Sequence, residues 1–395
     1  MTRGRPPLIG IDARKVRDFG IGSHIRSLLE AMAARPESER YRFRVYLRRE
    51  DREVLPEMPA HFDAVDETAR GYSLAEMTAF AWRLFRDRLD LFHATHYVLP
   101  PLLQSRAVVT IHDIIHLLYP QFLPSRAAHV YARFMIHRAL TRADRIITVS
   151  YNSKRDLIDY FGIPAARTEV IYNGVSSRFR SDPSPDERRR VREKFGLVGP
   201  YMLFLGGEKP HKNVQNVVRA FAEARRRTPL PHALVLAGPM PRNEGRLLNL
   251  VSALDLSSSI VRTGVVAEED LPALYAEAQA FLYPTLYEGF GLPVIEAMAC
   301  GTPVLTSSTS ALQEVAGGYA YLVDPMDVDA IAAGIVVLAT DEKVRNDFCE
   351  LGKKRALDFS WAKAAEKTLA VYAGALRGPR PKRKTEDGRR ETPAK

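Results

Sequence analysis

The chain has 395 residues, of which 46% are hydrophobic and 26% charged, and its formal net charge is +10. At about 100–200 residues per domain, this length predicts two domains, and the composition is that of a globular protein, not of a disordered or fibrous one. No apolar run approaches the roughly 20 residues that a membrane-spanning helix needs. Residues 1–10 lack the apolar segment of a signal peptide, and Cys300 and Cys349 form no metal-ligand spacing. We therefore expect a cytoplasmic protein.

The positive charge is concentrated near the C-terminus. Residues 377–395 include eight basic and three acidic side chains, three prolines and almost no apolar residue. Residues 378–395 are therefore expected to form a disordered basic tail. The charge could attract an anionic lipid surface or a nucleic acid, or it could serve only to keep the protein in solution.

Short β-rich runs alternate with amphipathic stretches, which predicts parallel sheets with helices on both faces. The first strand is expected at Leu8–Asp12, and after a glycine-containing loop Ser23 is expected to cap a helix that ends at Ala34. Ser150 is expected to cap a later helix. The other strands expected in this half are Phe43–Leu47, Leu91–His93, Val108–Ile111, Arg145–Val149 and Thr168–Tyr172.

A polar, proline-containing stretch from Ser181 to Glu187 is expected to link two halves of the chain. Strands of the second half are expected at Tyr201–Leu205, Ala233–Ala237, Ile260–Thr263, Ala280–Tyr283 and Val304–Leu305, with helices at Asn213–Arg226 and from Pro293 to Ala299. The fold class is therefore α/β, with residues 1–180 and 181–360 as two domains. If the domains face each other, the carboxyl ends of both sheets border one central cleft, where such sheets bind ligands.

The segment Tyr283–Glu296 carries the richest set of candidate site residues. A strand ends there, a turn with Gly289 and Gly291 follows, and a helix begins near Pro293. Free amides at such a turn can bind a diphosphate, and glycines allow the backbone to approach it closely. Glu288 and Glu296 could reach the same pocket, where a carboxylate can accept two sugar hydroxyls. The alternative is an ordinary helix start with acidic residues near its positive end.

Two further loops join a strand to a helix. Gly20-Ile21-Gly22 lacks the third glycine of a dinucleotide-binding fingerprint and could be only a turn. The loop from Gly206 to Asn213 lacks the spacing of a P-loop, yet Lys212 would lie at the start of a helix, where a cation can neutralise a leaving phosphate. A solvated surface lysine is the alternative.

His112 follows the strand Val108–Ile111, at the position of an active-site loop, although a lone histidine is more often structural than catalytic. Asp327-Val328-Asp329 resembles the Asp-x-Asp of metal-dependent transferases, but helix capping explains it better, and we expect no metal site. The stretch Leu123–Arg145 predicts a basic amphipathic helix, which could contact a membrane surface or pack its apolar stripe on its own domain.

With these motifs assembled, the chain resembles family 4 of the retaining glycosyltransferases, which have the GT-B fold of two Rossmann-like domains. The resemblance extends from about Leu8 to Arg377 and is most specific in YEGFGLPVIEAMACGTP, Tyr287–Pro303, which contains the family's Glu-x7-Glu motif. Secondary matches are FGIGSHIRSLL (Phe19–Leu29), TIHDIIHLLYP (Thr110–Pro120), ADRIITVSYNSKRDL (Ala143–Leu157), VIYNGV (Val170–Val175) and KPHKN (Lys209–Asn213).

The resemblance implies a role for each candidate residue. Gly22, with Gly20 beside it, would contact the donor diphosphate from the N-terminal domain, and Lys212 would bind it from the C-terminal domain. Glu296 would hold the ribose hydroxyls, and His112 would lie beside the transferred sugar. The donor sugar and phosphate would be held by Glu288, Gly289, Phe290, Gly291 and Leu292.

The same resemblance implies that residues 361–377 pack back on the N-terminal domain. One position departs from the family pattern, because His211 stands where many relatives have an arginine. Histidine is partly neutral near neutral pH, so neutralisation of the phosphate would depend more on Lys212.

The expected reaction is transfer of a hexose, mannose first, from GDP-mannose or a UDP-sugar to a saccharide or lipid-linked acceptor in bacterial envelope polysaccharide synthesis. No side chain is an obvious nucleophile, so attack on the same face as the leaving phosphate is expected, with retention of configuration and no cofactor. The alternatives are a nucleotide-sugar epimerase of the same fold and, from charge alone, a nucleic-acid-binding protein; no nucleic-acid partner is expected. Peripheral contact with the inner face of the membrane is also considered.

Overall fold

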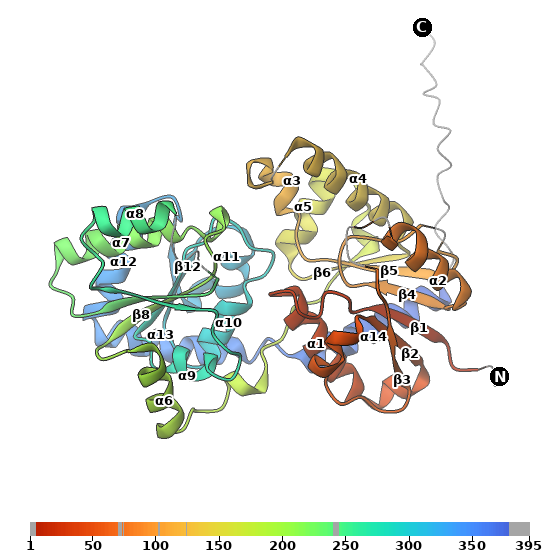
Figure 1. Ribbon diagram of the computed structural model, residues 1–395, viewed down its shortest axis with the longest axis horizontal. Helices are drawn as coiled ribbons and strands as arrows, with labels where there is room; N and C mark the ends of the chain where they lie inside the picture. Colours follow the sequence, from red (N-terminus) through yellow and green to blue (C-terminus); the bar gives the residue numbers. More distant parts are fainter. Residues whose placement is uncertain are drawn as a thin grey trace, which may run out of the picture.

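The computed structural model describes residues 5–69, 73, 75–101, 103–123, 125–239 and 245–378. Two α/β domains lie side by side (Figure 1). The tail expected at 378–395 lies, apart from Gly378, outside the described residues. No helix in the described part of the chain is long and apolar enough to cross a bilayer.

The N-terminal domain is built on a parallel sheet of seven strands in the order β3-β2-β1-β4-β5-β6-β7. These strands are β1 (Leu8–Asp12), β2 (Arg42–Leu47), β3 (Phe62–Asp66), β4 (Leu91–Ala94), β5 (Arg106–Ile111), β6 (Arg145–Thr148) and β7 (Thr168–Val170). Its helices are α1 (Ile21–Ala33), α2 (Ala81–Arg86), α3 (Ile115–Leu118), α4 (Arg126–Arg142) and α5 (Tyr151–Phe161). The apolar strands are buried on both faces, as parallel sheets require.

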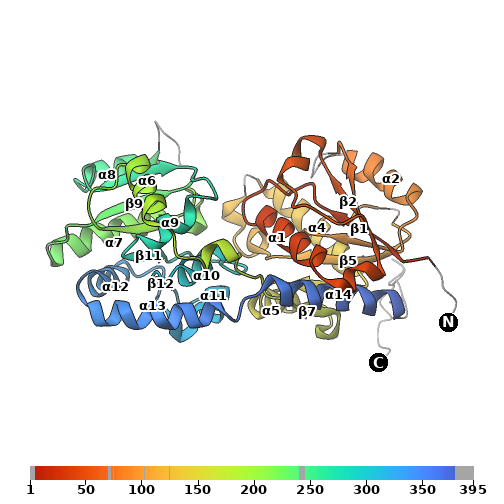
Figure 2. The same ribbon diagram turned by 90° about the horizontal axis from the view of Figure 1, so that it is seen from below.

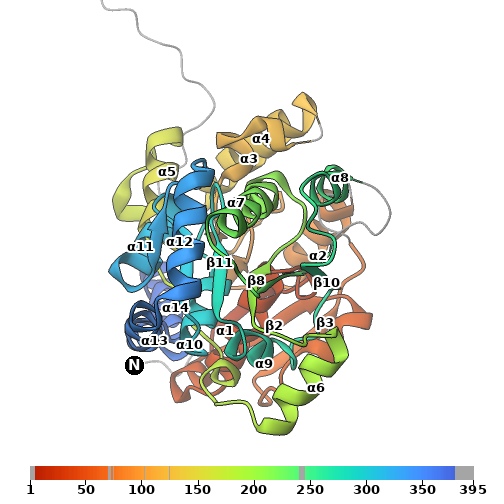
Figure 3. The ribbon, with the colours of Figure 1, turned by 90° about the vertical axis from the view of Figure 1, so that its left-hand side faces the viewer.

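The C-terminal domain has a second parallel sheet of six strands, in the order β10-β9-β8-β11-β12-β13. These are β8 (Tyr201–Leu205), β9 (Ala233–Ala237), β10 (Ile260–Gly264), β11 (Ala280–Tyr283), β12 (Val304–Ser307) and β13 (Tyr321–Val323). The helices are α6 (Pro185–Phe195), α7 (Val214–Arg227), α8 (Arg246–Ala253), α9 (Leu271–Ala276), α10 (Leu292–Ala299), α11 (Ser310–Ala316), α12 (Val328–Thr340) and α13 (Glu342–Ala356). Figure 3 shows α7 and α8 on one side of the strands and α9 on the other.

Amphipathic spacing explains how the helices pack. In α7, Val214, Val217, Val218 and Phe221 are buried and recur every three or four residues, so they form one apolar stripe against the sheet. Together with α8 and α12, this stripe forms the core on one face of the second sheet. The core on the other face contains residues of α9, α10 and α11.

The last helix, α14 (Trp361–Arg377), returns to the N-terminal domain (Figure 2). Leu369 and Tyr372 of α14 are buried in the same core as Ile25 and Leu29 of α1. At the crossing, a Cβ added to Gly174 would lie 2.1 Å from the backbone nitrogen of Trp361. The chain therefore passes between the domains twice, once before α6 and once before α14.

Three details differ from the sequence-based predictions. The stretch Ser181–Glu187, expected as a linker, includes the start of α6, because Ser184 caps this helix and forms a capping box with Glu187. Ser23 does not cap α1, because Gly20, with a φ of 66°, allows the helix to begin two residues earlier than Ser23 at Ile21. Two edge strands, β3 and β13, were not predicted. The predicted cap Ser150 is confirmed, since its side chain accepts a hydrogen bond from the backbone N–H of Ser153.

Candidate active site

A polar cluster of the C-terminal domain joins the two motifs Gly206–Asn213 and Tyr283–Glu296. Lys212 lies in the turn before α7, and its Nζ donates to Glu288 Oε1 at 2.7 Å and to the Tyr283 hydroxyl at 2.8 Å. The Tyr283 hydroxyl in turn lies 3.0 Å from the same oxygen of Glu288. The structure thus brings together Lys212 and Glu288, which are 76 residues apart in sequence.

This cluster keeps Lys212 positively charged. Burial alone would disfavour the cation, but attraction to the Glu288 carboxylate and to Tyr283 raises the pKa of Lys212 above its usual value. His211 behaves in the opposite way, because burial and the adjacent Lys212 lower its pKa to about 4. At neutral pH the loop therefore presents the Lys212 cation next to a neutral imidazole. Lys212 is therefore not the freely solvated lysine that was the alternative.

Asn213 fixes the path of the Lys212 loop. Its backbone adopts a left-handed conformation with a φ of 62° at the start of α7. Its side-chain amide donates to the carbonyl oxygens of Pro284 and Pro325 at 2.8 and 2.7 Å. Pro284 follows β11, so these bonds attach the Lys212 loop to the loop that carries Glu288.

The turn before α10 requires its two glycines for different reasons. Gly291 has a φ of 100°, and a Cβ there would lie 2.5 Å from a methyl group of Leu312. A Cβ on Gly289 would lie 2.4 Å from the carbonyl oxygen of His112, which belongs to the other domain. Phe290 between them is buried and packs edge-on against Phe359. This turn is therefore held in the core by Phe290 while its backbone touches the N-terminal domain.

His112 follows β5 and lies where the two domains meet. Its Nε2 is 3.1 Å from the carbonyl oxygen of Thr95, and its ring lies edge-to-face with His24 at 4.8 Å between centroids. Burial lowers the pKa of His112 to about 4, so the ring is neutral at physiological pH. The Ser153 hydroxyl bridges the domains here, within 2.8 Å of the His112 carbonyl oxygen and 3.2 Å of that of Gly289.

Glu296 lies one to two turns into α10 and borders a different part of the cleft. A cavity of about 640 Å³ between the domains is lined by Glu296, by Leu292, by Ser23 and Arg26 of α1, and by Trp361, among others. Tyr275 donates a hydrogen bond to Glu296 Oε2 at 3.2 Å. Burial raises the pKa of Glu296 to about 7, despite the hydrogen bond from Tyr275, which acts in the opposite direction.

The two glycines at the start of α1 are also required for different reasons. Gly20 is needed for its positive φ, whereas a Cβ on Gly22 would lie 2.4 Å from the carbonyl oxygen of Val16. Gly20 has no side chain that could cap α1, and the N–H groups of Ile21 and Gly22 already donate to the carbonyl oxygens of Phe19 and Asp18 at 2.6 and 2.7 Å. An anion that binds from the N-terminal side would therefore have to use other N–H groups of the first turn.

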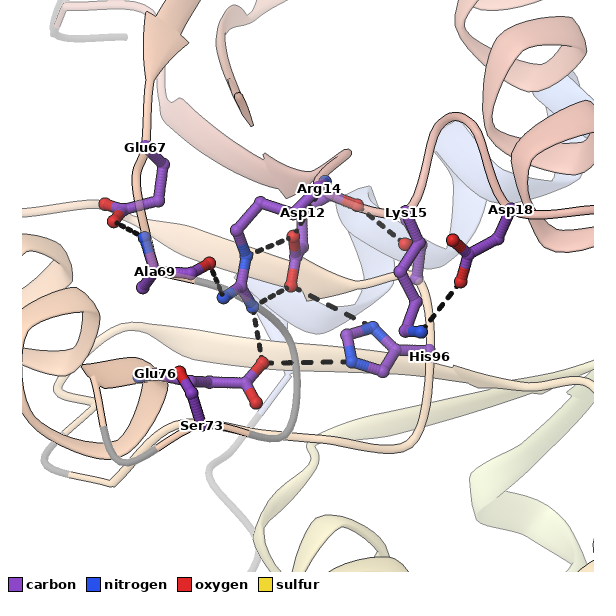
Figure 4. Close-up of polar contacts among 10 residues, drawn as sticks. Asp12, Arg14, Lys15, Asp18, Glu67, Ala69, Ser73, Glu76 and His96 are labelled. Atoms are coloured by element: carbon purple, nitrogen blue, oxygen red, sulfur yellow. Dashed lines mark hydrogen bonds and ion pairs between the residues drawn. The ribbon is translucent and has the colours of Figure 1, made fainter. Parts of the chain in front are cut away.

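A buried ionic network lies around Arg14, in the segment that connects β1 to α1 (Figure 4). Arg14, in the loop after β1, donates to Asp12 at 2.7 Å, to Glu76 at 2.6 Å and to the carbonyl oxygen of Ala69 at 3.1 Å. With His96, the two carboxylates form a group of three potential metal ligands whose atoms lie within 4.8 Å of one another. Since the Arg14 guanidinium already bonds both carboxylates, the network is better explained as an anchor for the loop than as a metal centre.

The other candidate metal motif is also explained by helix structure. Asp327 caps α12 by accepting from the backbone N–H of Ala330 at 2.9 Å, as the capping alternative predicted. The carboxylate of Asp329 pairs with Arg227.

Sequence comparison assigns the chain to a family. The profile described as Glycosyltransferase Family 4 matches residues 20–179, and the profile described as Glycosyl transferases group 1 matches residues 187–355. The O-antigen chain mannosyltransferase B of Escherichia coli is 36% identical over 303 residues, which cover 76% of this chain and 78% of that protein. The chain belongs to glycosyltransferase family 4. It is therefore a glycosyltransferase, and the matches favour this function over the epimerase and nucleic-acid-binding alternatives.

One further relative and one solved structure are also similar to the chain. The serotype-specific mannosyltransferase WbdA of Escherichia coli is 31% identical over 241 residues, which cover 60% of this chain but only 29% of that longer protein. Among solved structures, the sucrose-phosphate synthase of Thermosynechococcus elongatus superposes with a TM-score of 0.74 at 21% identity, covering 93% of this glycosyltransferase and 98% of that chain. The structural similarity confirms the predicted GT-B fold.

Sequence reasoning assigned no role to several residues of this candidate site. Tyr283 was predicted only as the end of a strand, and Tyr275 precedes Glu296 by 21 residues with no motif to connect them. Asp113, whose pKa is raised by burial, also faces the turn, since a Cβ on Gly289 would lie 2.9 Å from its Cβ. The only available signal for Tyr283 was its position at the carboxyl end of a buried strand.

Proposed function

We propose that the protein transfers mannose from GDP-mannose to a saccharide or lipid-linked acceptor of a bacterial envelope polysaccharide, with retention of configuration. The observation that carries the proposal is the charged group formed by Lys212, Glu288 and Tyr283 beside a glycine turn at a helix start. A cation and free amides at one place suit a departing diphosphate. The choice of mannose is supported by relatives that include an O-antigen chain mannosyltransferase and a serotype-specific mannosyltransferase.

In this proposal each group acts on the donor through its charge or hydrogen bonds. Lys212 neutralises the charge that builds on the leaving diphosphate, and Glu288 binds the transferred sugar while holding Lys212 in place. Glu296 accepts the ribose hydroxyls. Closure of the domains excludes water and brings the acceptor to the same face of the sugar as the leaving group.

Transfer of mannose to a mannose-terminated acceptor, followed by NMR of the new linkage, tests this function. GDP-mannose should support transfer with retention, and Lys212→Ala should lower kcat/KM by about 10²–10³-fold, the usual effect of removing one stabilising group at a developing charge. Lys209→Ala, at an exposed lysine in the same loop, is the matched control and should behave as the wild type. An inverted product, or a Lys212→Ala enzyme of normal activity, would contradict the proposal.

We also propose that helix α4 brings the enzyme to the inner face of an anionic membrane. The apolar stripe with Ile136 and Leu140 packs in the domain core, as one alternative predicted. A second apolar surface on the same helix is exposed, however, with Val130 at 65% and Phe134 at 60%. The helix contains four arginines and no acidic residue, which complements anionic lipid headgroups.

Sedimentation with vesicles tests this contact. Vesicles rich in phosphatidylglycerol should retain the protein, and Val130→Asp with Phe134→Asp should reduce retention several-fold. Leu357→Asp, at an exposed leucine of the other domain, is the control. A variant lacking residues 379–395 separates the contribution of the basic tail, and equal retention of wild type and the α4 double variant would exclude the helix.

A further inference from the structure

The cavity beside Glu296 contains a charged group that the proposed function does not use. Glu268 lies in the loop between β10 and α9, at the carboxyl end of the second sheet. Its Oε2 accepts from Arg178 Nη1 at 2.9 Å, and its Oε1 pairs with Arg26 of α1. All three side chains line the cavity. Glu268 thus connects a residue of the N-terminal domain to the interdomain segment, at the wall of a ligand-sized space.

The dimensions and position of this cavity suit a nucleoside. Its volume of about 640 Å³ falls within the roughly 300–1,000 Å³ of small-molecule sites. Glu296, which would hold the ribose, lines the same space, and both Glu268 and Arg178 lie close enough to influence its pKa. A ribose on Glu296 therefore leaves Glu268 among the groups available to the base.

The charge of Glu268 selects among the bases. A carboxylate offers two acceptors side by side and no donor. Guanine carries two adjacent donors, N1–H and the 2-amino group, on its Watson–Crick edge. Uracil has one N–H between two carbonyl oxygens, so a carboxylate would meet at least one carbonyl, and adenine and cytosine each place an acceptor beside their amino group. Guanine is the base that satisfies both oxygens.

Two ion pairs orient the Glu268 carboxylate and leave it accessible to a ligand. The side chain is 49% exposed, so it remains accessible, while Arg26 and Arg178 bind one oxygen each. Each carboxylate oxygen can accept a second hydrogen bond, and the arginines orient the group. We propose that Glu268 is a specificity-determining residue that recognises the guanine of the donor nucleotide, with Arg26 and Arg178 as its positioning residues. This inference rests on the proposed function, because it assumes the ribose on Glu296.

Calorimetric titration with GDP, IDP and UDP tests the proposal, because IDP differs from GDP only by lacking the 2-amino group. Wild type should bind GDP about tenfold more tightly than IDP, because IDP keeps the bond from N1–H and loses only the bond from the 2-amino group, and UDP should bind more weakly than GDP. Glu268→Ala should abolish this preference, so that the variant binds GDP and IDP equally. Glu269→Ala, at the exposed neighbouring acid, is the control and should keep the wild-type ratio.

The outcomes separate this inference from the proposed function. A purely structural role of Glu268 would weaken GDP and IDP equally and leave their ratio unchanged, which would overturn the inference. Preference of the wild type for UDP over GDP would also overturn it, although transfer from a UDP-sugar would keep the glycosyltransferase site intact. Failure of all three nucleotides to bind would remove both the inference and the proposed donor site.

Discussion

Tyr283 connects the two charged residues on which the proposed chemistry depends. Its hydroxyl contacts both Lys212 and Glu288, and its ring stacks on Phe281 at 5.4 Å between centroids. A hydrogen bond to a charged group contributes about 1.5–3 kcal/mol. Tyr283 therefore acts as a positioning residue for Lys212 and Glu288.

Tyr283→Phe keeps the ring and removes only the hydroxyl, so the fold should be retained. We expect kcat to fall about tenfold or more, because Lys212 loses one of its two fixed partners, with a smaller change in the KM of the donor. Steady-state kinetics with GDP-mannose measure both values. A variant in which only KM changes would show that the hydroxyl does not position the groups for the chemical step.

The raised pKa of Glu296 predicts that the free energy of unfolding depends on pH. Its pKa rises from 4.5 to about 7 on burial, so between these values the folded protein binds more protons than the unfolded chain. The contribution of Glu296 to the free energy of unfolding therefore falls as pH rises from about 4.5 to 7, with a slope approaching ~1.4 kcal/mol per pH unit.

Glu296→Gln removes this titration. The difference in Tm between variant and wild type should accordingly grow in favour of the variant as pH increases from 5 to 7. Thermal unfolding of both proteins at matched ionic strength measures the effect. Parallel Tm profiles over this range would contradict the assigned pKa shift.

Among the elements, α5 makes the clearest contact between domains. The Glu314 carboxylate of α11 accepts from the backbone N–H groups of Tyr151 and Asn152 at 2.8 and 2.9 Å. These amides belong to the first turn of α5, where the helix dipole favours a negative charge. Nearby, the Tyr287 hydroxyl donates to Asp156 of α5 at 2.6 Å. The C-terminal domain thus holds the start of an N-terminal helix.

Glu314→Ala should weaken this contact by about 1–3 kcal/mol, the cost of losing hydrogen bonds to a charged group. We expect a larger average separation of the domains, seen as a larger radius of gyration in X-ray scattering, and a several-fold higher KM for the donor. Glu350→Ala, at an exposed acid paired with Lys353, removes the same charge away from the interface and should have neither effect. Identical scattering of both variants would exclude Glu314 as an interdomain contact.

At the scale of the whole molecule, the alternation of strands and helices was sufficient to predict two parallel α/β units, because buried strands and amphipathic helices are local patterns. The edge strands escaped prediction for a physical reason. β3 carries Asp63 and Asp66 and is only partly buried, and β13 has three residues, so neither has the continuous apolar run of a central strand.

The candidate site was predictable only in part. Lys212, Glu288 and the glycine turn stand in motifs, and the structure brings them together. Contacts that form only through tertiary packing left no such signal in the sequence. Examples are the hydrogen bond from Tyr275 to Glu296, the hydrogen bonds from the start of α5 to Glu314, and the ion pairs of Glu268 with two arginines. In each case the partners lie on different elements, so spacing along the chain could not connect them.

The central claim is that the donor diphosphate binds between the Lys212 loop and the glycine turn, with the ribose on Glu296. A crystal structure of the protein with GDP tests it most directly. The account predicts that Lys212 Nζ contacts a phosphate oxygen and that Glu296 accepts both ribose hydroxyls. A nucleotide bound elsewhere, with Lys212 still paired only to Glu288 and Tyr283, would contradict it.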